Sequence, residues 1–449
     1  MRIKQISVSG LFGIFDHTIP LNMDDRITVI HGPNGFGKTA MLRILNGFFN
    51  SRYSELRTIP FSNFCVKFND SSYIEIIKNT EHSETIDNNM VFNFYQQNLD
   101  VLSFPLEQIK IRPDTLDFPL SVLDNCIPGL DRIGPKTWLY NPTEELLSLE
   151  EVLERFNNLL PLNLKLQEEP DWLGKLKNNI HVRLIESQRL LNFVPNRRSK
   201  SDNRTSSMLS TVSAYSYELA KLMQDKFKEY GTISQSLDRT FPMRVVKQQS
   251  SPDLTEEELR NQLNELEETR SRLIEVGLLD QDEDSEFQIQ PQDIDESTKN
   301  ALSVYVEDVE KKLDVFTEIA TKINLLKIII NNKFSYKEIN FSKDKGFVFK
   351  ILYNSSLSDS KTLSPTDLSS GEQHELVLLY ELLFKVQPNS LVLIDEPELS
   401  LHVGWQVQFL RDLQEITKLT DLDILMATHS PDIIQDRWDL TVELKGQGK

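Results

Sequence analysis

The feature that most limits the fold of this chain is a glycine-rich stretch near its N-terminus, "GPNGFGKT", at residues 32–39. It follows a short apolar run rich in β-branched residues, "ITVIHG", which predicts a buried strand, and a helix is expected from about Thr39. A glycine-rich turn between a strand and a helix surrounds an anion with backbone N–H groups at the positive end of the helix. The stretch therefore predicts a phosphate-binding loop in an α/β fold.

Residues of this loop are expected to hold a nucleotide and its metal ion. Lys38 would neutralise the β and γ phosphates, and Thr39 would supply a hydroxyl ligand to Mg²⁺. Phe12 and Phe15 precede the loop, where packing on adenine and packing in the core explain them equally well. The complete set of loop residues expected to contact the nucleotide is Asn34, Gly35, Gly37, Lys38 and Thr39.

Length, charge and cysteine content restrict the class of protein. With 449 residues the chain exceeds the size at which one hydrophobic core stops growing, so two or more lobes are expected. A formal net charge of −19 opposes binding of the whole surface to DNA or to an anionic membrane, so a nucleic-acid contact must be local. We expect a cytoplasmic protein, because no signal peptide or membrane-spanning run is evident. Cys65 and Cys126 form no CxxC pair and indicate reduced, structural thiols.

A second apolar run ends in acidic residues, "LVLIDEPE", at residues 391–398. A buried parallel strand would deliver Asp395 and Glu396 at its carboxyl end, where ligands of open α/β sheets bind. Asp395 is then expected to hold Mg²⁺, directly or through water, and Glu396 to act as general base on the attacking water. Without the phosphate loop, an ordinary strand that ends in a solvated turn would explain the pair equally well.

Two polar residues that follow other predicted strands complete the expected catalytic set. His429, in "MATHSP", could donate a hydrogen bond to the γ-phosphate and orient the water, although a single histidine is often structural. Gln188, in "IESQRL" after a strand at 181–187, could contact Mg²⁺ or water, and an exposed polar residue is the alternative.

The stretch "DLSSGEQHEL", residues 367–376, places two serines and a glycine before a predicted helix without any cationic side chain. Ser369, Ser370 and Gly371 can offer N–H groups to a phosphate, assisted by the helix dipole. Because the chain already has a phosphate loop, this helix start is a second anion site, which would close on the nucleotide of another subunit. The alternative is that the serines only cap the helix.

The middle of the chain is predicted to be helical. Leucines 259, 263, 266 and 273 form one apolar stripe, and a second stripe is the seam of a coiled coil of about three heptads. An antiparallel hairpin and a helical bundle both explain this pattern. The predicted fold is an α/β head of residues 1–190 and 335–449, interrupted by a helical insertion at 191–334. The second stripe consists of Val306, Val309, Leu313, Phe316, Ala320 and Ile323.

The ordered set "GPNGFGKT", "IESQRL", "LSSGEQ", "LVLIDEPELSLH" and "ATHSP" resembles the Walker A, Q-loop, signature, Walker B with D-loop, and H-loop of ABC-type ATPases. The split head with a helical insertion is similar to the Rad50/SMC/RecF group. The resemblance implies an ABC-ATPase head with a mixed sheet, ATP and Mg²⁺ as cofactors, and a signature that acts in trans. It also implies that Ser400 and His402 lie at the interface of a head-to-head dimer.

Within that group the chain resembles compact ATPases of bacterial anti-phage defence, such as the AriA subunit of PARIS and the PtuA subunit of Septu. The resemblance implies a homo-oligomer that controls a separate nuclease effector, of the TOPRIM or HNH type, in response to a phage protein or nucleic acid, without a membrane. A RecF/Rad50-like DNA repair ATPase and a scaffold that binds ATP but hydrolyses it little are the alternatives.

Three departures from the relatives qualify this resemblance. Ser370 and Glu372 replace a glycine and a glutamine of the common signature, and a glutamate near phosphate is repulsive unless it points away. No CxxC lies at the tip of the insertion, which opposes a zinc-hook Rad50. The sequence continues for 20 residues after His429, too few for a TOPRIM domain, so nuclease chemistry is expected from a partner.

Overall fold

The chain folds into two compact units, which are described separately. The computed structural model describes residues 1–78, 90–97, 99–106, 120–140, 145–156, 169–185, 210–247, 255–280, 295–352, 362–399 and 401–446. The first unit comprises Met1–Thr211 and Val377–Lys449, and the second, Val212–Leu376, is mainly helical. The predicted α/β fold with a helical insertion is confirmed. The helical unit extends past residue 334 because a small sheet packs on its last helix.

A five-stranded parallel sheet forms the centre of the first unit. Each strand is a short apolar run, and Ile27, Val29 and Ile30 of one central strand are completely buried. Because all neighbouring strands are parallel, their carboxyl ends lie at the same edge of the sheet. In spatial order the strands are β11 (Val182–Ile185), β15 (Leu391–Asp395), β16 (Asp423–Ala427), β3 (Ile27–His31) and β17 (Thr441–Glu443).

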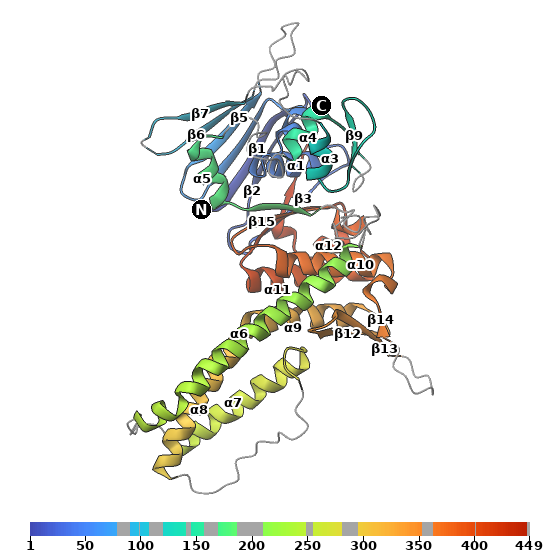
Figure 1. The fold of residues 1–449 in the computed structure, drawn as a ribbon. Coiled ribbons are helices and arrows are strands. Elements are labelled where there is room, and N and C mark those ends of the chain that lie inside the picture. The colour runs from blue at the N-terminus through green and yellow to red at the C-terminus, as the bar shows by residue number, and fades with distance from the viewer. Residues whose placement is uncertain are drawn as a thin grey trace. The chain divides into compact units, whose positions relative to one another are not determined.

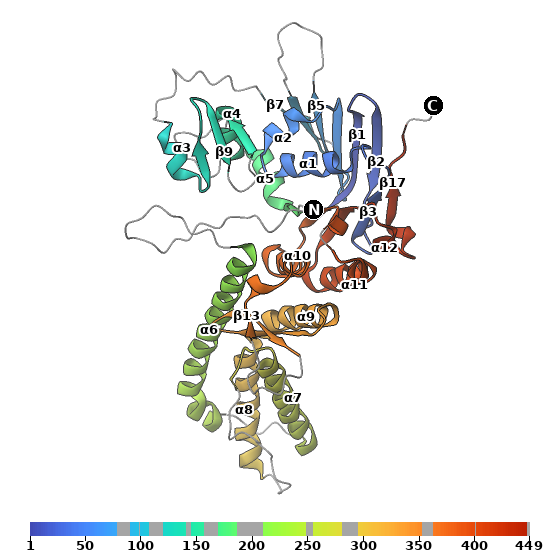
Figure 2. The same ribbon diagram turned by 90° about the vertical axis from the view of Figure 1, so that its right-hand side faces the viewer.

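A six-stranded antiparallel sheet lies beside helix α1 (Lys38–Phe49), as Figures 1 and 2 show. The strands alternate buried and exposed residues, as expected for a sheet with one buried face. Phe48 of α1 meets Phe92 of this sheet with ring centroids 5.4 Å apart, while α1 also packs on β11 and β15. The order is β2 (Phe15–Pro20), β1 (Ile3–Leu11), β4 (Asn63–Phe68), β5 (Tyr73–Lys78), β6 (Met90–Tyr95) and β7 (Leu102–Leu106).

Smaller elements complete the first unit. The hydrophobic cluster around the buried Trp138 holds a small sheet of β8 (Leu130–Arg132), β9 (Thr137–Tyr140) and β10 (Glu145–Ser148) against α3 (Ser121–Cys126) and α4 (Leu149–Arg155). The remaining α-helices of this unit are α2 (Tyr53–Thr58), α5 (Asp171–Asn179), α11 (Val403–Thr420) and α12 (Pro431–Ile434). Short helical turns lie at Glu381–Lys385, Pro397–Leu399 and Trp438–Leu440. Within the described residues no helix is long and apolar enough to cross a bilayer.

The second unit contains long helices and a three-stranded sheet. The four leucines of the predicted stripe are buried on α7, which packs beside α8 (Figure 2). Arg244 of α6 forms a double ion pair with the buried Asp308 of α8, so three helices pack together as a bundle. The elements are α6 (Thr211–Lys247), α7 (Glu256–Glu275), α8 (Glu296–Asp314), α9 (Thr317–Lys333), β12 (Lys337–Ser342), β13 (Gly346–Ile351), β14 (Thr362–Leu363) and a turn at Pro365–Asp367.

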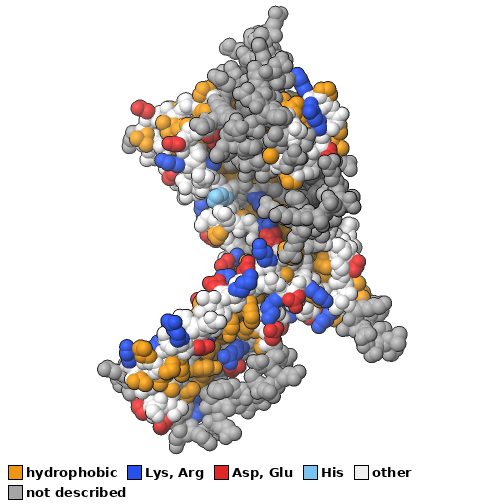
Figure 3. Space-filling model, viewed as in Figure 1, with side chains coloured by type: hydrophobic (Ala, Val, Ile, Leu, Met, Phe, Trp, Pro, Cys, Tyr) orange, Lys and Arg blue, Asp and Glu red, His pale blue; other side chains and the backbone are white. Residues whose placement is uncertain are grey.

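The predicted coiled-coil seam does not run along one helix. α8 ends at Asp314 and α9 begins at Thr317, so the stripe is divided by a turn. At this turn Phe316 is completely buried and its ring lies 5.3 Å from that of Tyr230 on α6. Packing of this phenylalanine against a third helix therefore replaces a continuous two-helix seam. Figure 3 shows apolar side chains gathered over the lower part of the helical unit. Met243 and Val246 of α6 are exposed.

Candidate nucleotide-binding site

The glycine-rich loop connects β3 to α1 at the carboxyl edge of the parallel sheet. Gly35 and Gly37 have φ angles of 84° and 88°, which L-residues with side chains rarely adopt. A Cβ atom on Gly37 would also lie 2.3 Å from Cδ2 of the buried Leu11, whereas nothing lies within 4 Å of one on Gly35. The loop conformation thus depends on glycine at both positions, and at Gly37 it also depends on close packing.

Lys38, the first residue of α1, is almost completely buried at the base of the loop. Its Nζ atom donates to the carbonyl oxygens of Gly32 and Pro33 at 2.9 and 3.2 Å, and it lies 3.5 Å from Nδ1 of His429. Burial lowers the pKa of Lys38 below its ordinary value, and the carboxylates of the neighbouring acidic residues oppose this effect. The ammonium group is therefore held at the position from which it could contact a phosphate.

Thr39 and Asp395 bring two oxygen ligands together. Thr39 Oγ1 donates a hydrogen bond to Asp395 Oδ1 at 3.1 Å, so the start of α1 contacts the carboxyl end of β15. A hydroxyl and one carboxylate fit Mg²⁺, which usually keeps several water ligands and takes the remainder from substrate phosphates. No cluster of three or more His, Cys, Asp or Glu side chains that could hold a metal occurs in the described part of the chain.

Glu396 and His429 lie next to each other after adjacent parallel strands. Glu396 has a φ angle of +43°, and its backbone N–H donates to Ala427 at 2.9 Å. Such strain in a non-glycine residue often marks a functional position. Glu396 Oε1 lies 3.5 Å from Nε2 of His429, whose backbone N–H donates to Glu398 Oε1 at 2.6 Å. Glu398 thus fixes the position of His429, a role that the sequence analysis did not assign.

The glycine-rich loop, the start of α1, Glu396 and His429 line a pocket of about 340 Å³. Its lining includes Asn34, Gly35, Gly37, Lys38, Thr39, Glu396 and His429, all of them predicted from the sequence. Phe12, Arg43 and Ile59 also line it. Phe12 lines the pocket and is 43% exposed, so part of this residue is available to a ligand. Phe15 instead packs on Phe36, with ring centroids 5.1 Å apart.

The second predicted anion site lies in the helical unit, at the start of α10 (Ser370–Tyr380). Both the backbone N–H and the hydroxyl of Ser369 donate to Glu372 Oε2 at 2.8 Å. Lys337 Nζ contacts the same carboxylate at 2.6 and 2.8 Å. Burial raises the pKa of Glu372, but Lys337 and Ser369 outweigh it, so the pKa lies below its ordinary value. Glu372 is therefore ionised and already neutralised within its own chain.

Two predicted residues lie outside the described part of the chain, namely Gln188 and Ser400. His402 is described and is exposed, and its Nδ1 accepts the backbone N–H of Gly404 at the start of α11. The structure brings together Lys38, Thr39, Asp395, Glu396 and His429 within the first unit.

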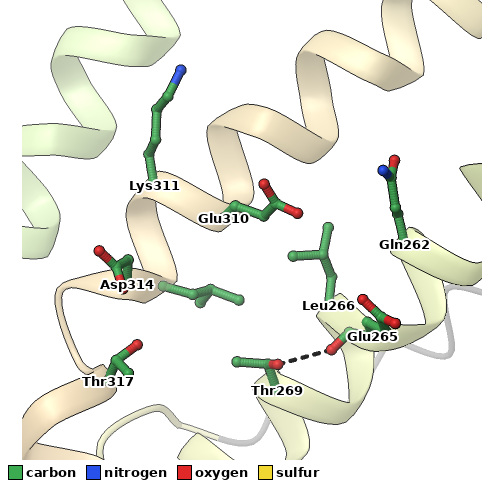
Figure 4. Close-up of a pocket in the computed structure, with 9 residues that line it drawn as sticks. Gln262, Glu265, Leu266, Thr269, Glu310, Lys311, Asp314 and Thr317 are labelled. Carbon is green, nitrogen blue, oxygen red and sulfur yellow. Dashed lines mark hydrogen bonds between the residues drawn. The ribbon is translucent and has the colours of Figure 1, made fainter.

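A second depression, of about 370 Å³, lies between α7 and α8 in the helical unit (Figure 4). Glu265, Glu310 and Asp314 make its lining acidic, and the Thr269 hydroxyl already donates to the Glu265 carbonyl at 2.8 Å. A polyphosphate would be repelled by these carboxylates. With three carboxylates and one lysine, Lys311, in its lining, the depression is less suited to a nucleotide than the pocket of the glycine-rich loop.

Fold and site together define the class of P-loop nucleotide-binding α/β proteins. Residues 1–434 match the family described as AAA ATPase domain, and the chain belongs to this family. The Septu protein PtuA from Bacillus thuringiensis is 25% identical over 203 residues, 41% of this chain and 48% of the relative. The chain thus matches about half the length of this curated relative.

Solved SMC heads are also similar to the chain. One is the Smc head domain with an extended coiled coil bound to the C-terminal domain of ScpA, from Pyrococcus furiosus. It is 12% identical, with a TM-score of 0.33, and covers 96% of this chain and 91% of its own. The SMC head domain from Thermotoga maritima is 10% identical, with the same TM-score, and covers 97% and 92%. At a TM-score of 0.33 these similarities support no conclusion about this chain.

Alanine substitutions at Gly35 and Gly37 test whether close contact with Leu11, in addition to the φ angle, requires glycine at position 37. Gly35→Ala should cost about 1–2 kcal/mol for a left-handed alanine. Gly37→Ala should cost a further 1–3 kcal/mol, because its Cβ would collide with Leu11. Denaturant unfolding without nucleotide measures both, and Gly35→Ala is the matched control for φ strain. Equal losses would show that Leu11 does not restrict the loop.

Proposed function

We propose that this chain binds ATP with Mg²⁺ in the pocket of the glycine-rich loop and hydrolyses it to ADP and phosphate. The observation that carries the proposal is the convergence of a buried lysine, a hydroxyl–carboxylate pair and a glutamate–histidine pair at one edge of the parallel sheet. This combination supplies cationic, metal-binding and proton-accepting groups at one edge of the sheet, as phosphoryl transfer requires.

Each residue has a role that follows from its chemistry. Lys38 and the loop N–H groups bind the phosphates, and Thr39 with Asp395 would hold Mg²⁺, which supplies neutralisation of phosphate charge when bound. The Glu396 carboxylate accepts the proton of the attacking water. His429 orients that water or the γ-phosphate, because its backbone is fixed by Glu398 and its ring lies beside Glu396. Gln188 would contact Mg²⁺ or the attacking water, as the resemblance to ABC-type ATPases implies.

The site is completed by a second copy of the chain. Of the three residues predicted from the sequence, Ser369 already donates its N–H and hydroxyl to Glu372. The first N–H groups of α10 have no acceptor inside the helix, so Ser370 and Gly371 can offer theirs to the γ-phosphate of a partner. The Glu372 carboxylate is neutralised by Lys337, which lowers the repulsion that a glutamate would cause there. Leu399, Val403 and Val407 follow the strand that carries Asp395 and are exposed, which supports a protein–protein contact in this part of the chain.

We infer that ATP-dependent association of the heads controls a separate nuclease effector in anti-phage defence. The similarity to the Septu protein PtuA supports this role. ATP can favour the closed pair of heads only if it binds the closed arrangement more tightly than the open one. Slow hydrolysis then sets how long the effector is held.

Substitution of the proposed base tests the enzymatic role. Glu396→Gln preserves the shape of the side chain but cannot accept a proton, so turnover should fall by about 10² or more while ATP binding persists. Phosphate release at saturating ATP measures turnover, and a fluorescent ATP analogue measures affinity. Lys38→Ala is the matched variant and should lose binding. Unchanged turnover in Glu396→Gln removes Glu396 from the role of base.

The same variant tests association and separates defence from DNA repair. Light scattering of Glu396→Gln should show a dimer or a higher oligomer with ATP and Mg²⁺, and Gly371→Asp in that background should prevent it while ATP affinity is retained. Adding duplex DNA at physiological salt should not increase the mass further, because the surface is acidic. An ATP-dependent DNA complex would instead favour a repair role, and an unchanged mass with ATP would contradict the composite site.

A further inference from the structure

His17 is a buried titratable residue next to the glycine-rich loop that the proposed chemistry does not use. It lies on β2, in the antiparallel sheet, opposite Val8 of β1, and is 5% exposed. We propose that His17 is a positioning residue, which fixes the orientation of the Phe36–Gly37 peptide and thereby the affinity of the loop for nucleotide phosphate. The inference rests on the proposed ATP binding.

The contact between His17 and the loop is a hydrogen bond to the backbone. His17 Nε2 lies 2.9 Å from the carbonyl oxygen of Phe36. A carbonyl oxygen can only accept, so Nε2 carries the hydrogen and donates it. In a trans peptide the carbonyl and the following N–H point in opposite directions. Since the Phe36 carbonyl points to His17, the Gly37 N–H points away from it, and Gly37 lines the pocket.

The orientation of the Phe36–Gly37 peptide must be fixed by a contact from outside the loop, because its second residue is a glycine. Gly37 has a φ angle of 88°, and glycine adopts positive and negative φ about equally readily. Rotation of the Phe36–Gly37 peptide would therefore meet little intrinsic resistance on its glycine side. In the rotated peptide the carbonyl would replace the N–H as the group presented to a phosphate, which repels an anion. The hydrogen bond from His17 selects the orientation that presents the donor.

The ring of Phe15 packs against both His17 and Phe36. The Phe15 ring stacks on the His17 ring, with centroids 5.6 Å apart and an interplanar angle of 15°. It also packs on the Phe36 ring at 5.1 Å. Strand β2 thus holds the loop by a ring contact and by a directed hydrogen bond. Only the hydrogen bond specifies which way the peptide faces.

The test compares variants that keep or lose the donor. His17→Leu removes it, while His17→Gln places an amide N–H at a similar reach. With the full chain, His17→Leu should weaken ATP binding and raise KM on the order of tenfold, because a buried hydrogen bond is lost. The kcat at saturating ATP should change much less, since uniform binding is affected. His17→Gln should restore affinity to within about threefold.

Ile19→Ala is the matched control for stability. Ile19 is completely buried on the same face of β2. This substitution should lower the melting temperature without changing ATP affinity. If His17→Leu does not fold, His17→Phe keeps the stack on Phe15 without the donor and should show the same loss of affinity.

Three results would overturn the inference. If the wild type binds ATP and His17→Leu binds it equally tightly, His17 only packs the core, and the proposed function stands. If His17→Gln is as weak as His17→Leu, the donor is not the relevant feature. If the wild type shows no saturable ATP binding, both this inference and the proposed function fail.

Discussion

The parallel pairing of β15, β16 and β3 is the constraint on which the site depends. Parallel strands end at the same edge, so the residues that follow Asp395, Ala427 and His31 meet there although they are far apart in the sequence. The glycine-rich loop and α1 follow β3 directly, which adds a helix N-terminus to that edge. A change in strand order would separate the acids from the lysine, whatever their local conformation.

Two ionised side chains near the proposed phosphate positions are stabilised within their own chain before any ligand is considered. Lys38 is buried, and the loop carbonyls and neighbouring carboxylates hold its ammonium group. In the helical unit Lys337 plays the corresponding role for Glu372. Both arrangements keep an ionised side chain satisfied at a location where a phosphate is proposed to arrive. Neutralisation of Glu372 by Lys337 lowers the repulsion that a polyanion would meet at the start of α10.

Most of the site could be predicted from the sequence because its residues belong to contiguous motifs. Lys38, Thr39, Asp395, Glu396 and His429 each follow a recognisable apolar strand or glycine-rich turn. His17 and Glu398 could not be found in this way, because their roles depend on contacts with residues that are distant in the sequence. The interruption of the second helical stripe was also missed, since neither glycine nor proline marks the turn at 315–316 and the contact of Phe316 with Tyr230 joins residues far apart in the sequence.

The most direct test of the central claim is a structure of Glu396→Gln with ATP and Mg²⁺. We expect the β and γ phosphates within the loop of residues 32–39, and the metal ion about 2.0–2.1 Å from Thr39 Oγ1 and next to Asp395. Ser370 and Gly371 of a second copy should face the γ-phosphate. A nucleotide bound elsewhere, or a metal ion in contact with neither Thr39 nor Asp395, would contradict the account.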